Sequence, residues 1–183
     1  MAQRPRNCLS VWALVALLVK CPLLIALFFE MNDIDVLDRR ILIELQADAS
    51  LSTSDLAERV GSSSASVWRR VKALEAQGVL LKAVRLVDAQ KVGRGVDVIC
   101  HVRMNSHVRD ARSAFEDFII ERPEVLECFS MTGEWDYLLR VVVADVAGYE
   151  QFLMRVLLEH PSVDNASSHF ALSRTKYSTA IPV

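Results

Sequence analysis

The residues best suited to chemistry in this sequence are eight small, aromatic and basic side chains close together: Ser63, Ser64, Ala65, Ser66, Trp68, Arg69, Arg70 and Lys72. Guanidinium and ammonium groups bind phosphates, and a guanidinium also matches the O6/N7 edge of guanine. Small residues at the start of a helix let its backbone approach base pairs closely. The pattern therefore predicts that these eight residues contact double-stranded DNA.

Two alternatives to this interpretation stay open. A basic run such as Arg69, Arg70 and Lys72, taken alone, is also typical of a solvated helix face. Its position on a helix that follows a tight turn at Gly61 favours DNA contact instead. Trp68 either packs over the edge of the first helix or wedges against DNA, and packing is the favoured interpretation.

Three predicted helices position this segment. The first spans residues 34–47, where apolar side chains recur at helical spacing and Asn32 or Asp33 is the expected N-cap. The second begins after Ser52 and stops at Gly61. The third spans residues 64–77, with Ser63 as N-cap. Its inward side chains are Val67, Val71 and Leu74, and its neighbours in the core are Ile34, Leu37, Ile41, Leu42, Leu45, Leu56, Ala57 and Val60. Two short helices with a three-residue break are typical of a helix-turn-helix.

A short apolar run follows the third helix. Residues 79–86 form a short strand-like run, which would be the wing of a winged helix-turn-helix, with Lys82 and Arg85 able to reach the DNA backbone. Residues 88–95 contain Gly93 and Gly95 and are predicted to be a hinge. The expected domains are therefore 31–87 for DNA binding and 96–183 for a second function.

The second half of the chain alternates strands with helices. Strands are predicted at residues 96–104, 125–131, 135–143 and 163–172, and helices at 108–122 and 146–159. This order is the βαββαβ pattern of a ferredoxin-like α+β domain. Its sheet has one face without helices, and two such faces can cover each other, so we expect a symmetric dimer.

Charge and cysteine content narrow the functional classes. The net charge is −2 overall, +2 over residues 1–30, 0 over 31–91 and −4 over 92–183, so DNA contact is expected in the first half. The four cysteines, Cys8, Cys21, Cys100 and Cys128, form no Cys-x-x-Cys pair. This spacing predicts neither a disulfide framework nor a zinc site, and no cofactor or metal is expected.

The first 30 residues differ in composition from the rest of the chain. Residues 9–29 are almost wholly apolar after Arg4 and Arg6, which is long enough for a membrane span, but Lys20 lies in the middle. A helix entry follows Met31 directly. We therefore expect translation to begin at Met31 and the protein to be cytoplasmic. A membrane-tethered DNA-binding sensor is the alternative.

Three segments resemble the Lrp/AsnC (feast/famine) transcriptional regulators. They are IDVLDRRIL at residues 34–42, LAERVG at 56–61 followed by VWRRVKALEAQGVL at 67–80, and TGEWDY at 132–137. The resemblance runs from Met31 to the end, 153 of 183 residues. It implies dimers joined through the C-terminal sheets, often assembled into tetramers or octamers. It also implies regulation of amino-acid metabolism.

The resemblance further implies an amino-acid-like effector near a turn of the second domain. The residues carried over are Thr132, Gly133, Glu134, Trp135 and Asp136, with Ser168 on the last strand. Backbone N–H groups at a glycine turn can hold a carboxylate, and Asp136 can meet an ammonium. The alternative is a hairpin turn with a structural Asp136.

Three residues depart from the family pattern: Ser62 in place of a core leucine, Ser64 in place of a frequent proline, and Ala166 in place of a hydroxyl residue. Residues 167–171 and 176–182 look most like members that respond to cysteine or other small amino acids.

An enzyme on the same fold is the second functional class. Siroheme decarboxylases resemble this family in fold, so architecture alone does not exclude catalysis. The histidines His101, His107, His160 and His169 show no partner at catalytic or metal spacing in the sequence. The sequence therefore predicts no catalytic residues and a non-enzymatic regulator.

Overall fold

The computed structural model describes residues 34–183, which form two compact units. The first contains residues 34–83 and 178–183, and the second contains residues 84–177. No helix within residues 34–183 is both long and apolar enough to cross a membrane. The predictions on the apolar leader, on Met31 and on Asn32 and Asp33 concern residues outside this range.

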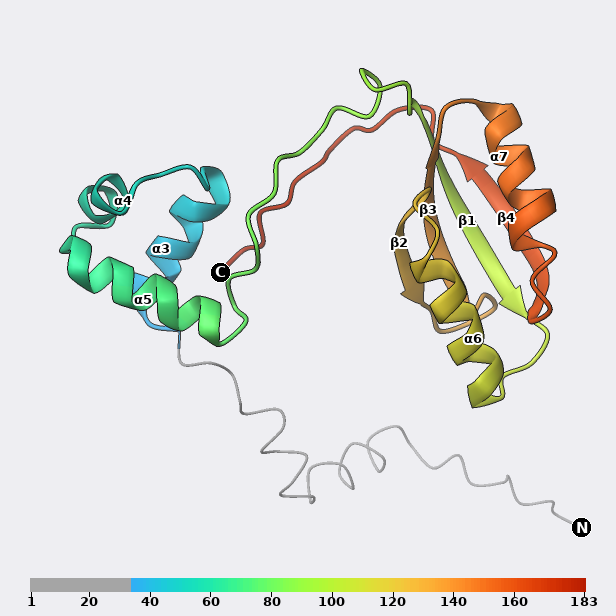
Figure 1. The fold of residues 1–183 in the computed structure, drawn as a ribbon, viewed down its shortest axis with the longest axis horizontal. Coiled ribbons are helices and arrows are strands. Elements are labelled where there is room, and N and C mark those ends of the chain that lie inside the picture. Colours follow the sequence, from blue (N-terminus) through green and yellow to red (C-terminus); the bar gives the residue numbers. More distant parts are fainter. Residues whose placement is uncertain (1–33) are drawn as a thin grey trace, which may run out of the picture. The chain divides into compact units, whose positions relative to one another are not determined.

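The first unit contains the three predicted helices, α3 (Val36–Ala47), α4 (Thr53–Val60) and α5 (Ser64–Ala76) (Figure 1). Their core is formed by Ile41, Leu42, Leu56, Ala57, Val60, Val67 and Leu74. The positions chosen from helical spacing are therefore confirmed as the inward side of each helix, with Val71 packed at the margin of the core.

The helix ends follow the predicted caps at three of four places. The hydroxyl oxygens of Ser52 and Ser63 accept backbone N–H bonds at the starts of α4 and α5. Gly61 ends α4 in the left-handed region, at φ 69°. The N-cap expected for the first helix was wrong, since Asp35 fills that role. Asp35 and Asp38 form a reciprocal capping box, with N···O distances of 2.8 and 3.3 Å.

The wing strand predicted at residues 79–86 is not formed. The N–H groups of Val79 and Leu80 both bond to the carbonyl of Leu74, closing the end of α5. The rest of the run has no backbone partner among the bonds found in residues 34–183, and Leu81 remains 82% exposed. A strand needs a neighbouring strand for its hydrogen bonds, and a strand-like sequence alone does not supply one.

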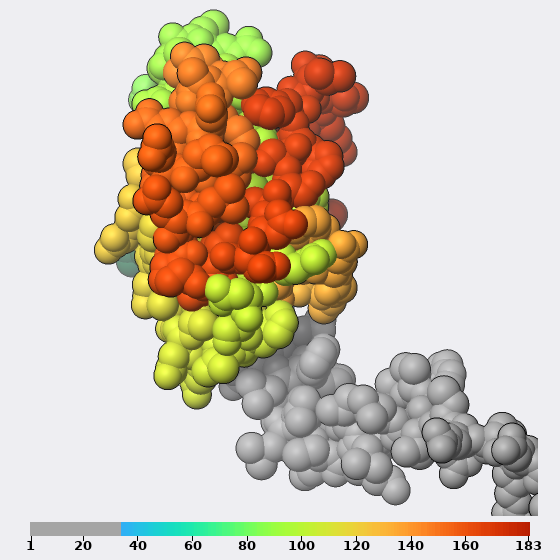
Figure 2. Space-filling model, turned by 90° about the vertical axis from the view of Figure 1, so that its right-hand side faces the viewer, coloured from blue at the N-terminus to red at the C-terminus, as the bar shows by residue number. Residues whose placement is uncertain are grey.

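The second unit has the predicted βαββαβ order. Its elements are β1 (Val96–Met104), α6 (Arg109–Ile120), β2 (Val125–Ser130), β3 (Tyr137–Val143), α7 (Val146–Phe152), η1 (Leu153–Leu157) and β4 (Val163–Phe170). The antiparallel sheet has the order β2-β3-β1-β4. Figure 2 shows the helix-covered side, with α7 in orange beside β4 in red and α6 in yellow-green.

The two faces of this sheet differ. On β1 the side chains of Val98, Cys100, Val102 and Met104 are buried against the helices, while the alternate side chains of Ile99, His101 and Arg103 are half-buried on the other face. We call the latter the open face. The helix predicted over residues 146–159 is α-helical only to Phe152 and continues as a π-helical turn, in which the N–H of Leu158 bonds to the carbonyl of Leu153.

One histidine lies half-buried against the aromatic side chains of α6. The ring of His160 lies 5.5 Å from that of Phe115 and 4.7 Å from that of Phe118, and its Nδ1 accepts the N–H of Ser162 at 3.2 Å. Burial lowers the pKa of His160 below its ordinary 6.5. The neutral imidazole is therefore the form that this packing favours.

Protonation of His160 is expected to destabilise the folded protein. The unfolded chain takes up a proton near pH 6.5, and the folded protein does so only at a lower pH. The contribution of His160 is thus complete above that pH and is lost progressively as the pH falls toward the lowered pKa. Urea unfolding of the parent and of His160→Asn, which cannot titrate, should show a flatter decline in the variant between about pH 7 and 5. Equal slopes would contradict this origin.

Candidate functional site

The N-terminal turn of α5 is presented as the sequence predicts. Ser63, Ser64 and Ala65 are exposed, and Ser66 is half-buried. Ser63 Oγ accepts the N–H of Ser66 at 3.3 Å, so this hydroxyl caps the helix. The capped turn has small side chains on its surface, so a large partner can approach it closely. A negatively charged partner is favoured there, because the helix dipole places partial positive charge at the N-terminus.

Loss of the Ser63 cap should weaken both the helix and its partner binding. Ser63→Ala is expected to lower the free energy of unfolding by about 1 kcal/mol. Ser63→Asp retains the cap but adds a negative charge at the same position. Denaturant unfolding should therefore show a loss of stability for Ser63→Ala but not for Ser63→Asp. DNA titrations should show weaker binding for both variants. Tight DNA binding by the aspartate variant would argue against contact at this turn.

Arg69 is the basic side chain that α5 offers most freely. It is exposed and forms no ion pair within residues 34–183. Lys72, one turn further on, is also exposed, and its Nζ lies 2.7 Å from Glu75 Oε2 on the same helix. Such an exposed i,i+3 pair is weak, so Lys72 can exchange Glu75 for a phosphate at little cost.

Arg70 lies apart from these two residues. Its Nη1 bonds to Asp35 Oδ2 at 2.5 Å and to Asp38 Oδ1 at 2.8 Å, at the N-terminus of α3. The hydrogen bonds that Arg70 donates, first to Asp38 and then to Asp35, raise the pKa of Arg70. Position 70 is three residues after buried Val67 and four before buried Leu74, which places Arg70 on the inner side of the helix. Arg70 therefore joins α5 to α3 instead of pointing outward.

Trp68 is exposed over 58% of its surface. It lines a groove of the first unit together with Leu45, Val71, Leu80 and Leu81. The indole thus lies beside apolar side chains of α3, of α5 and of the segment after α5, without being enclosed by them.

The second candidate site is the turn between β2 and β3. Thr132, Gly133 and Glu134 are exposed, and Gly133 has φ +109°, a conformation that side-chain-bearing residues rarely adopt. Glu134 Oε1 binds Arg103 Nη2 at 2.6 Å, and the Arg103 guanidinium lies 4.9 Å from the centroid of the Trp135 ring. The structure therefore adds Arg103 of β1 to the predicted turn residues.

Both carboxylate oxygens of Asp136 contact other groups of the protein. One carboxylate oxygen accepts the N–H of Met104 at 2.8 Å, and the other lies 3.3 Å from His107 Nδ1. The backbone of Asp136 is bonded to Val102 and Met131. Asp136 thus fastens the turn to β1, which supports the structural alternative for this side chain.

Ser168 is not brought together with the turn. It lies opposite Cys100 on β1, and its hydroxyl lies 2.5 Å from the Tyr149 hydroxyl under α7. The turn instead meets the open face, where the ring of His101 is 5.9 Å from Trp135 and 5.4 Å from His169. Because neighbouring residues of a strand point to opposite faces, the sheet separates Ser168 from Trp135.

Sequence reasoning missed Arg103, His101 and His169 as neighbours of the turn. Arg103 and His101 are alternate residues of β1, and His169 lies on β4 opposite Ile99. The alternation of side chains along β1 predicts that Arg103 and His101 share one face of the sheet. Only the strand order β2-β3-β1-β4 shows that this face lies beside the turn.

Comparisons with known proteins agree with this geometry. Residues 34–80 match the winged helix-turn-helix DNA-binding domain, and residues 97–181 match the Lrp/AsnC ligand binding domain. The chain is 37% identical over 150 residues to the DNA-binding transcriptional activator DecR of Escherichia coli, covering 82% of this chain and 99% of the relative. It is 35% identical over 150 residues to the glutamate uptake regulatory protein of Zymomonas mobilis, covering 82% and 91%.

Solved structures give the same match. A transcriptional regulator of Neisseria meningitidis in complex with L-methionine superposes with a TM-score of 0.77 at 35% identity, covering 81% of this chain and 96% of the other. An AsnC family regulator from Agrobacterium tumefaciens gives 0.77 at 41% identity, with the same coverage.

Proposed function

The chain belongs to the Lrp/AsnC family of DNA-binding transcriptional regulators, and from that premise we propose that it contacts DNA through the outer side of α5. The proposed contacts are Ser64, Ala65, Arg69 and Lys72, with Ser63 as the cap of the helix. The observation that carries this proposal is Arg69, exposed and without an ion pair within the described residues, next to a capped turn of small residues. Arg70 is proposed to position α5 through Asp35 and Asp38.

An electrophoretic mobility shift with salt titration tests this proposal. The probe is the DNA upstream of the protein's own gene, with an unrelated fragment of equal length as the control. We expect specific retardation that weakens with salt, because binding releases counterions from the phosphates. Absence of retardation at every salt concentration, together with no enriched sites in immunoprecipitated DNA, would contradict the assignment.

The proposed effector is a small amino acid bound at the turn of residues 132–136 with Arg103. The support is chemical. The turn offers backbone N–H groups around Gly133, and half-buried Arg103 and exposed Glu134 can exchange their mutual ion pair for the carboxylate and ammonium of an amino acid. The relative from Neisseria meningitidis was crystallised with L-methionine. Calorimetric titration with cysteine, methionine, leucine and glutamate, on the parent and on Arg103→Ala, tests the site.

The protein is further proposed to act in the cytoplasm, to self-associate through the open face of the sheet, and to have no catalytic activity. The proposed functional division is 31–87 for DNA binding, 88–95 as a hinge and 96–183 for effector binding and assembly. One relative that matches 82% of the chain is named as a DNA-binding transcriptional activator, and another as an uptake regulatory protein. A purified protein that binds a tetrapyrrole would contradict the non-enzymatic assignment.

A further inference from the structure

The last residues of the chain return to the first unit. Residues 178–183 group with residues 34–83 and not with the sheet that they follow in sequence. The contact is made by Gln46, near the end of α3. Its Oε1 accepts the N–H of Ile181 at 2.6 Å, and its Nε2 donates to the carbonyl of Ile181 at 3.1 Å.

This pairing has the chemistry of a peptide-binding contact. A glutamine side chain carries one acceptor oxygen and an NH₂ donor, which match the two polar groups of a backbone residue. Both backbone groups of Ile181 are used, whereas its side chain is 70% exposed. Recognition therefore depends on the backbone of the segment more than on an apolar side chain.

The segment that precedes it is fastened separately to the second unit. Arg174 Nη2 lies 2.8 Å from Asp97 Oδ2, and the N–H of Ala171 donates to the Asp97 carbonyl at 2.9 Å. The Arg174 guanidinium also lies 5.0 Å from the centroid of the Tyr177 ring. Residues 171–174 thus have contacts of their own within the second unit, separate from the contact of Ile181 with Gln46 in the first.

Residues 171–183 form neither a helix nor a strand. Ordering a backbone residue costs about 1–2 kcal/mol, so two hydrogen bonds alone would not hold a free peptide on α3. A covalently tethered peptide binds at an effective concentration in the range of about 1 mM, which compensates for a weak contact.

We propose that the α3 surface around Gln46 is a peptide-binding surface whose ligand is the protein's own C-terminal segment, residues 178–183. The proposal goes beyond DNA and effector binding and does not depend on either.

Hydrogen–deuterium exchange of the full-length protein tests the surface. The variants are Gln46→Ala and, as a matched control, Gln151→Ala, which removes an exposed glutamine of α7. We expect the peptide containing Ile181 to exchange about fivefold slower in the parent than in Gln46→Ala, as one net hydrogen bond predicts. Gln151→Ala should match the parent. Unchanged exchange within α3 and unchanged circular dichroism show that Gln46→Ala remains folded.

A second readout uses carboxypeptidase, with the truncated masses followed over time. The tail of Gln46→Ala should be trimmed several-fold faster than the tails of the parent and of Gln151→Ala. Equal exchange and equal trimming in all three proteins would overturn the proposal. Protection that disappears on dilution would also overturn it, because the tail would then be held by a second copy and not by its own chain.

Discussion

Replacing Arg69 and Lys72 by glutamate together should weaken binding to the operator about 100-fold or more at physiological salt, because each lost contact to a base or phosphate costs about 1–3 kcal/mol. Both side chains are exposed on the outer side of α5, and Arg69 has no ion pair within the described range. The slope of log affinity against log salt should also become shallower by about one for each lost phosphate contact.

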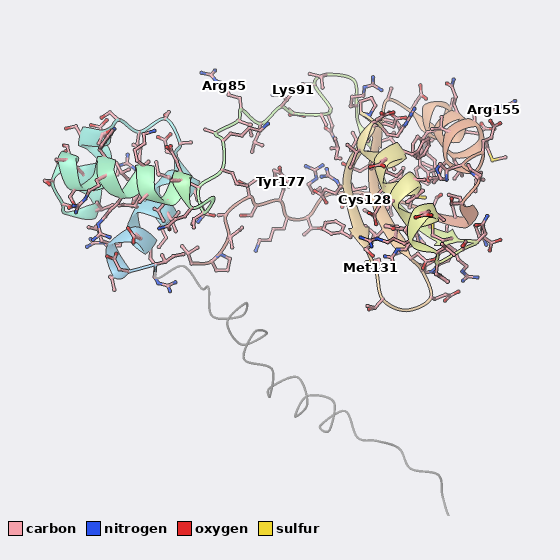
Figure 3. The ribbon with its side chains drawn as sticks, turned by 60° about the horizontal axis from the view of Figure 1, so that its bottom comes forward. Arg85, Lys91, Cys128, Met131, Arg155 and Tyr177 are labelled. Atoms are coloured by element: carbon pink, nitrogen blue, oxygen red, sulfur yellow. The ribbon has the colours of Figure 1, made fainter. Side chains whose placement is uncertain are left out.

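The matched control reverses the same number of charges elsewhere. Arg109→Glu with Arg155→Glu changes α6 and the turn after α7, where both side chains are exposed and Arg155 points outward (Figure 3). Fluorescence anisotropy with a labelled operator should give nearly parental affinity for this control. If both double variants lose affinity equally, net charge and not the α5 surface determines binding.

Truncating Phe115 to alanine should remove about 3–5 kcal/mol from the free energy of unfolding of the second unit. Phe115 is fully buried, and its ring lies 4.8 Å from that of Tyr137 and 5.5 Å from that of His160. The cavity would lie where α6 meets the sheet, so ordered packing beneath β3 would be lost with it.

Ile120 of the same helix supplies the control for this prediction. It is 80% exposed, so Ile120→Ala should change the stability by no more than about 0.5 kcal/mol. Urea unfolding followed by circular dichroism measures both variants. A small loss for Phe115→Ala would mean that α6 does not form the core described above.

Much of the fold could be predicted because local patterns and tertiary packing agree. Val67 and Leu74 are buried at the spacing that makes α5 amphipathic, and Ser63 caps it. The strand β1 has the predicted bounds, Val96–Met104, because every second side chain is apolar and buried. Where a residue suits both the local secondary structure and the packing of the core, its position can be predicted from the sequence.

The structure differs from the expected arrangement of the candidate sites where the direction of a side chain depends on distant partners. Arg70 reads as one of three basic residues, yet Asp35 and Asp38 of α3 hold it inward. Ser168 reads as a neighbour of the turn, yet its pairing with Cys100 places it on the other face of the sheet. Neither partnership can be read from spacing within one element.

Two features depend on partners that the local sequence does not reveal. The apolar run of residues 79–86 resembles a strand, but it has no partner strand in the described chain. The contact of Gln46 with Ile181 joins residues 135 positions apart and uses backbone atoms of the latter. Backbone recognition leaves no pattern of side chains, so the sequence does not reveal it.

Photocrosslinking from the start of α5 tests the central claim most directly. A benzophenone amino acid placed at Ala65, which is exposed on the first turn of α5, should crosslink to bases of the bound operator. The same probe at Ala147, exposed on α7, should not. A retarded complex in which Ala147 crosslinks and Ala65 does not would show that another surface of the protein holds the DNA.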